Sequence, residues 1–76
     1  MARSSKRIKV NLKLSVIDSE QLKKIALKHN GDLVVEEILF YGSNMQLRHQ
    51  YAFETHENLR SFLDDVSNNF KKVSKI

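Results

Sequence analysis

The sequence predicts a small α+β domain in which two helices pack on one face of a three-stranded antiparallel sheet. Strand-like and helix-like patterns follow one another in the order β-α-β-β-α, and each pattern has one apolar side. The chain has 76 residues, of which 41% are hydrophobic and 29% are charged. This composition fits one globular domain with a thin core. We therefore expect a basic N-terminal arm over residues 1-6 and a single α+β domain over residues 7-76.

The first strand is predicted by alternation from Arg7 to Ile17. A period of two is typical of a strand with one buried face and one wet face. The side expected to be buried carries Ile8, Val10, Leu12, Leu14 and Val16, and the wet side carries Arg7, Lys9, Asn11, Lys13 and Ser15.

The first helix is predicted from about Ser19 to His29. Asp18 is placed to cap its start, and Gln21 completes the pattern of a capping box. Asn30-Gly31 offers the left-handed conformation that ends helices. Leu27 falls outside the apolar stripe, which consists of Leu22, Ile25, Ala26 and His29.

Two further strands are predicted to form a hairpin around Gly42-Ser43-Asn44. The run from Asp32 to Tyr41 is rich in β-branched and aromatic residues, and its alternation changes phase at Glu36-Glu37, where we expect a β-bulge. The next run alternates regularly. Its inward side carries Met45, Leu47, His49, Tyr51 and Phe53, and its outward side carries Gln46, Arg48, Gln50, Ala52 and Glu54.

The last helix is predicted to begin after the capping residue Thr55 and to continue towards the end of the chain. Its apolar residues fall within an arc about 100° wide. They are Leu59, Phe62, Leu63, Val66, Phe70 and Val73, and the lysines Lys71, Lys72 and Lys75 complement the C-terminal end of the helix dipole.

A right-handed crossover places the third strand between the first and the second, which gives the strand order 1-3-2. This arrangement resembles the ferredoxin-like split β-α-β fold without its last strand. The resemblance implies an architecture and no activity, because many unrelated functions use this fold. The first strand becomes a sheet edge, and its alternating lysines discourage edge-to-edge aggregation.

The chain lacks the patterns of known catalytic, nucleotide and metal sites. It has no cysteine, and its two glycines cannot form a phosphate-binding loop. His29, His49 and His56 lie on different predicted elements, and the adjacent carboxylates Glu36-Glu37 and Asp64-Asp65 are expected to be solvated. We therefore expect no enzyme, no catalytic residue, no metal site and no cofactor.

His49 is the one polar residue on the inward side of the third strand. We expect it to be a partly exposed histidine near the rim of the sheet. The alternative is a base or a buried pH switch.

Binding is therefore the expected activity. The net charge is +4, and residues 1–17 carry five cations and no acid. The wet face of the sheet and the N-terminal arm form the predicted binding surface, whose residues are Arg3, Lys6, Arg7, Lys9, Lys13, Arg48 and Gln50.

Two hypotheses share this surface. The first is a small regulatory module that acts on a protein partner, for example a complex that handles nucleic acid, as accessory or inhibitor proteins of phages and bacteria do. The second is direct nucleic-acid binding with weak sequence specificity, dominated by phosphate contacts. The outward positions of the third strand carry no aromatic residue for base stacking. The apolar residues Leu27, Leu39 and Tyr41 are further candidates for contact with a protein.

The sequence has no apolar run of the roughly 18 residues that cross a bilayer and no signal-peptide pattern. We therefore expect a cytoplasmic protein without a membrane partner. The free edge of the first strand offers a route to a homodimer.

Overall fold

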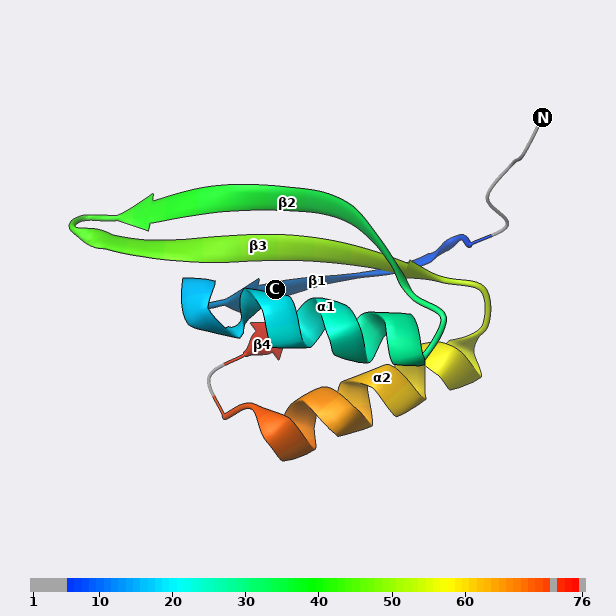
Figure 1. Ribbon diagram of the computed structural model, residues 1–76. Helices are drawn as coiled ribbons and strands as arrows, with labels where there is room; N and C mark the ends of the chain where they lie inside the picture. Colours follow the sequence, from blue (N-terminus) through cyan, green and yellow to red (C-terminus); the bar gives the residue numbers. More distant parts are fainter. Residues whose placement is uncertain (1–5, 72, 76) are drawn as a thin grey trace.

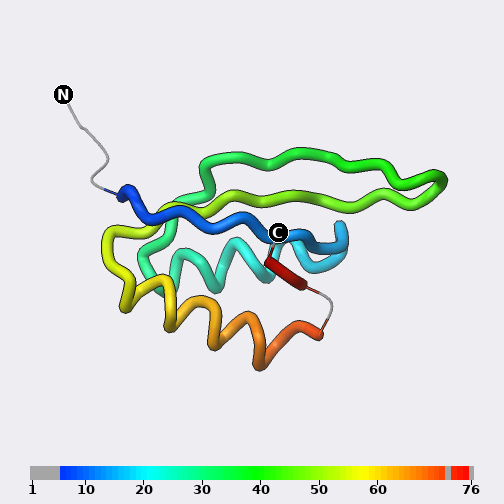
Figure 2. The backbone as a smooth tube through the Cα atoms, turned by 180° about the vertical axis from the view of Figure 1, so that it is seen from behind, coloured from blue at the N-terminus to red at the C-terminus, as the bar shows by residue number. Residues whose placement is uncertain are grey.

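The computed structural model describes residues 6–71 and 73–75. The elements are β1 (Ile8–Leu14), the 3-10 turn η1 (Val16–Asp18), α1 (Ser19–Lys28), β2 (Asp32–Tyr41), β3 (Asn44–Phe53), α2 (His56–Asn69) and β4 (Ser74–Lys75). Both helices lie on one side of the sheet, and the other face has no helix over it (Figures 1 and 2). The predicted α+β class, with an antiparallel sheet and two helices, is confirmed.

The sheet has four strands in the order β2-β3-β1-β4, and all neighbouring strands are antiparallel. The predicted three-stranded sheet of order 1-3-2, lacking the last strand of the ferredoxin-like fold, is therefore wrong in strand number. Phe70 and Val73 fit the helical arc of the sequence, but α2 ends at Asn69. The chain then turns back, and Ser74–Lys75 pairs with β1.

The free edge of the sheet differs from the prediction as well. Leu12 and Lys13 of β1 pair with Lys75 and Ser74, so β1 is not a sheet edge at these positions. At the other side, β2 is the outermost strand of the described sheet over its ten residues. The predicted homodimer would pair through the edge of β1, and β4 already occupies part of that edge.

The structure confirms some of the signals predicted at the ends of α1 and α2 and contradicts others. Thr55 caps α2 as predicted, since its hydroxyl accepts a hydrogen bond of 3.1 Å from the Asn58 backbone N–H. Asn30 takes the expected left-handed conformation (φ 61°) after α1. The Asp18–Gln21 capping box is wrong, because Asp18 has a helical backbone and its side chain makes no capping bond. The strand also ends early, so Val16, expected to face inward, lies exposed in η1.

The core lies between the helices and the inner faces of β1 and β3. Phe62 of α2 packs against Tyr51 and Phe53, with ring centroids 5.2 and 5.0 Å away. Gly31 lies so close to this cluster that a Cβ at its position would be 2.6 Å from the Phe53 ring. The buried apolar residues that form this core cluster are Val10, Leu12, Leu14, Leu22, Ala26, Leu47, Tyr51, Phe53, Phe62, Val66 and Phe70.

The β2–β3 hairpin extends well beyond the helices (Figures 1 and 2). Its turn is formed by Gly42-Ser43, the first two residues of the predicted turn, whereas Asn44 already belongs to β3. Gly42 has a positive φ of 63°. The expected bulge at Glu36-Glu37 is wrong, since the irregularity lies between Leu33 and Val35. The alternation of inward and outward side chains therefore shifts at Leu33–Val35, before the predicted position. As a result Glu36 lies opposite His49 and Glu37 lies opposite Arg48.

Candidate functional site

The outward side of the sheet gathers the residues that the sequence placed on the wet face of two strands. Lys13 pairs in register with Arg48, and Asn11 pairs with Gln50. Lys9 lies on the same face of β1, because residues two apart share one face. We refer to Lys9, Asn11, Lys13, Arg48 and Gln50 as the open face.

Hydrogen bonds hold the centre of the open face in place. The Asn11 Oδ1 accepts from Arg48 Nη1 at 2.8 Å and from Gln50 Nε2 at 3.2 Å. Arg48 Nε also donates to Glu37 Oε1 of β2 at 3.1 Å. These contacts join three strands, and they match the charge of Arg48 with a carboxylate.

The two lysines of the open face differ from Arg48 in this respect. Within residues 6–71 and 73–75, neither Lys9 nor Lys13 forms a salt bridge with an acid. The Lys13 ammonium lies 5.3 Å from the centre of the Tyr41 ring, which is within the range of a cation–π contact. Lys9 and Lys13 are therefore the cations that the open face offers to a partner.

The remaining predicted binding residues lie elsewhere. Arg3 is outside the described residues. Lys6 forms a 3.0 Å salt bridge with Asp32 at the start of β2, and Arg7 is exposed one residue before β1. The structure thus brings together Lys9, Lys13, Arg48 and Gln50, and it places Lys6 beside β2.

A second polar cluster lies inside the domain. His49 is fully buried (0% exposed), so the expectation of a partly exposed histidine is wrong. Its Nδ1 is 2.7 Å from the Tyr51 hydroxyl, and its Nε2 is 2.8 Å from Glu36 Oε2. Glu36 also lies 3.4 Å from the Lys23 ammonium and accepts a hydrogen bond from Ser19.

The hydrogen bond from His49 and the charge of Lys23 lower the pKa of the Glu36 carboxyl, against the opposing effect of desolvation. Burial, reinforced by the Glu36 carboxylate, raises the pKa of the Tyr51 hydroxyl. His49 is buried and both of its nitrogens are engaged, and the cluster connects β2, β3 and α1. Glu36 and Lys23 are partly exposed and, with Ser19, line a hollow at the surface.

Sequence reasoning treated Glu36 as a solvated residue and missed its role in this cluster. The missed signal is the spacing along the strand. Glu36 is two and four residues from Ile38 and Phe40, so all three face the helix side of the sheet. Glu37 has the opposite parity, and it faces the open side.

The helices are joined by a third polar contact. His29 Nε2 lies 2.5 Å from Asp65 Oδ2, and the Lys28 ammonium lies 3.5 Å from the same oxygen. The hydrogen bond from His29 and the charge of Lys28 lower the pKa of Asp65. This contact holds α1 to α2, whereas His56 is exposed at the start of α2.

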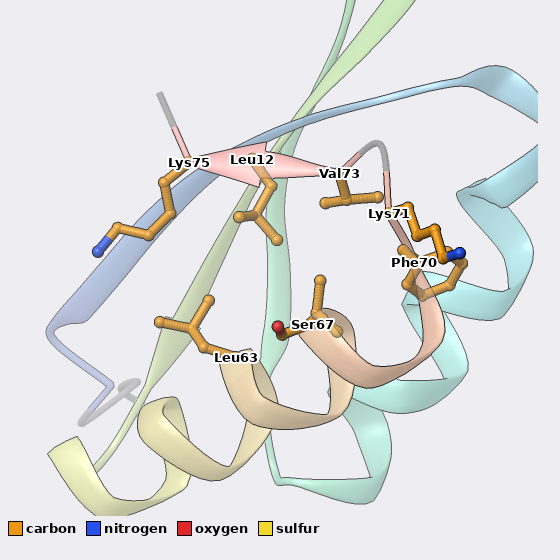
Figure 3. Close-up of a pocket in the computed structure, with 8 residues that line it drawn as sticks. Leu12, Leu63, Ser67, Phe70, Lys71, Val73 and Lys75 are labelled. Atoms are coloured by element: carbon orange, nitrogen blue, oxygen red, sulfur yellow. The ribbon is translucent and has the colours of Figure 1, made fainter.

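Several surface hollows lie on the part of the chain that the structure describes. The hollow in Figure 3, about 440 Å³ in volume, lies between α2 and β4. Its lining is mainly apolar, with Ser67, Lys71 and Lys75 as its polar side chains. Among the described residues, no three His, Cys, Asp or Glu side chains converge as metal ligands. No helix of this part is long and apolar enough to cross a membrane.

No protein-family model matches this sequence, and no curated protein matches it either.

Proposed function

We propose that this protein is a non-enzymatic binding module that takes an acidic protein surface onto its open face. The observation that supports the proposal is a helix-free sheet face with an ordered polar centre and two lysines that lack an acidic partner in the described structure. Asn11, Gln50 and Arg48 are held in place before binding, so little side-chain entropy is lost there on association. Lys9 and Lys13 supply the charge that attracts carboxylates.

A protein partner is favoured over nucleic acid by the charge balance of this face. Arg48 already interacts with Glu37, so that few cations remain for phosphates. With about two phosphate contacts, from Lys9 and Lys13, log K for nucleic acid would fall with log salt at a slope of only about −2, which implies weak binding at physiological salt. The described surface of the central strands also carries no outward aromatic residue for base stacking.

The test is affinity capture from a lysate of the source cells with the double variant Lys9→Glu/Lys13→Glu. On the open face Lys9 is exposed and Lys13 is half-buried, and neither belongs to the buried core, so the variant should fold as the wild type does. In a nuclease-treated lysate, we expect the variant to fail to capture the proteins that the wild type captures. The control is Lys24→Glu/Lys71→Glu, which makes the same change in charge at exposed positions outside the open face and should retain them.

The proposal fails if the open-face variant captures the same proteins as the wild type. It also fails if capture is abolished by nuclease, and if the purified chain binds a labelled oligonucleotide with the salt slope given above. In that case nucleic acid is the ligand of this face.

A further inference from the structure

The second surface of interest is β2, which forms a free edge of the described sheet. Seven of its ten residues are apolar or aromatic, namely Leu33, Val34, Val35, Ile38, Leu39, Phe40 and Tyr41. β2 contains neither lysine nor proline, the residues that commonly protect an edge from pairing with another chain. Its pairing with β3 is regular from Val35 to Tyr41, so alternate backbone N–H and C=O groups point away from the sheet over this stretch.

We propose that a second copy of this chain pairs with β2 in antiparallel orientation, so that two four-stranded sheets join into one. Such a pair has a two-fold axis perpendicular to the sheet. The helices of both copies then lie on one side, and both open faces lie on the other. This proposal is independent of what binds the open face.

The apolar side chains of the two ends of β2 complement each other in this arrangement. At the hairpin end, the helix-side face carries Ile38, Phe40 and Met45, which are 54%, 72% and 46% exposed because the hairpin extends beyond the helices. At the other end, Leu27 of α1 is 70% exposed and lines a hollow together with Leu33 of β2.

Antiparallel pairing places the hairpin end of one β2 beside the starting end of the other. With Ile38 opposite its own copy, Phe40 lies across from Glu36 and diagonally next to Leu33 of the second copy, because the bulge makes Leu33 the next helix-side position after Glu36. Leu27 lines a hollow with Leu33, so Phe40 approaches both residues, and the contact occurs twice. A strand from an unrelated protein would satisfy the backbone groups but would bring no such matching apolar residues. The complementarity thus favours a second copy as the occupant.

Charge does not oppose this pairing. Each acid of β2 has a basic partner within its own chain: Asp32 pairs with Lys6 at 3.0 Å, Glu36 with Lys23 at 3.4 Å and Glu37 with Arg48 at 3.1 Å. A register with Ile38 opposite its own copy places Glu36 across from Phe40 and Glu37 across from Leu39. Like charges then do not face each other across the new strand pair.

The available area is sufficient for a weak, specific dimer. Taking roughly 200 Å² for a fully exposed large apolar side chain, the helix-side patch of Leu27, Leu33, Ile38, Phe40 and Met45 offers about 500 Å² per copy. The backbone edge adds to this area. The total approaches the roughly 600 Å² per partner at the lower end of specific interfaces.

The test is sedimentation equilibrium of the full chain from about 10 μM to about 1 mM, combined with hydrogen exchange of the β2 amides. We expect the mass to rise from 8.9 kDa towards twice that value, with slower exchange at high concentration for Val35–Tyr41. Raising the salt concentration should leave the dimer intact or strengthen it, because two chains of net charge +4 repel each other.

The variant Ile38→Lys/Phe40→Lys should weaken dimerisation at least tenfold. Both side chains are exposed in the single chain, so circular dichroism should show an unchanged fold. The control Ser61→Lys/Asn68→Lys adds the same charge at exposed positions of α2 and should dimerise as the wild type does.

Three results would overturn the proposal: a wild type that remains monomeric at 1 mM, a dimer that the β2 variant does not weaken, or a dimer whose β2 amides exchange as fast as those of the monomer. If the wild type remains monomeric, the occupant that remains for the β2 edge is an extended segment of a different protein. None of these results affects the test of the open face, which uses different residues.

Discussion

The buried contact between Tyr51 and His49 should contribute to stability in a way that a double-mutant cycle can isolate. Tyr51→Phe removes only the hydroxyl, which lies 2.7 Å from His49 Nδ1. His49 is fully buried, so this nitrogen would lose its partner where water does not reach it. An unsatisfied buried polar group costs about 1–3 kcal/mol. A domain of this size has a free energy of unfolding of only about 4–11 kcal/mol, so the loss should be easily measured.

The second arm of the cycle is His49→Leu, which leaves the Tyr51 hydroxyl unpaired in the core. In this background Tyr51→Phe should cost less than about 0.5 kcal/mol or should stabilise the fold, because both polar partners are then absent. Glu36 keeps its contact with Lys23 and is partly exposed to water, so it remains satisfied in all variants.

The assay is urea unfolding followed by circular dichroism at neutral pH. The Tyr51 hydroxyl is protonated there, since its pKa is ordinarily about 10 and burial raises it further. If Tyr51→Phe costs as much in the His49→Leu background as in the wild type, the two residues are not coupled and the described network is wrong. A cost below 0.5 kcal/mol in the wild type would refute the argument as well.

Two further predictions concern the glycine at the end of α1 and the acids of the polar clusters. Gly31→Ala should destabilise the fold by about 1–3 kcal/mol through overpacking against the buried Phe53 ring, and Phe53→Leu should relieve part of this cost in a combined variant; additive unfolding energies would contradict the steric explanation. Hydrogen bonds from histidine lower the pKa values of Glu36 and Asp65 below their ordinary values of 4.5 and 3.8. Their contribution to stability is thus complete above these ordinary values and is lost as the pH falls through the lower values of the folded state. Urea midpoints should therefore decrease below about pH 4.5, less steeply for Glu36→Gln; a midpoint that does not change with pH in this range would disprove the linkage.

Much of the fold follows from local patterns that act within a single element. Alternation in β1 and β3 determines which side chains face the helices, because residues two apart on a strand share one face. The cap by Thr55 and the left-handed Asn30 likewise depend on the backbone next to them. The residues of the open face were predictable for the same reason, since the parity of Lys9, Lys13 and Arg48 is a property of each strand alone.

The remaining features depend on contacts between segments that are distant in the sequence. The last residues continue a helical apolar pattern, yet Ser74–Lys75 forms a strand because β1 offers unpaired backbone groups there. Glu36 lies opposite the buried His49 because of the bulge between Leu33 and Val35. The residue pattern of β2 alone does not indicate the position of this bulge.

The sequence by itself thus determined the α+β class and the residues of the open face. Only the tertiary structure decided which strand remains at the edge and which polar side chains are buried. Strand pairing and burial are set by the partners that the folded chain brings together, and a local pattern contains no information about those partners.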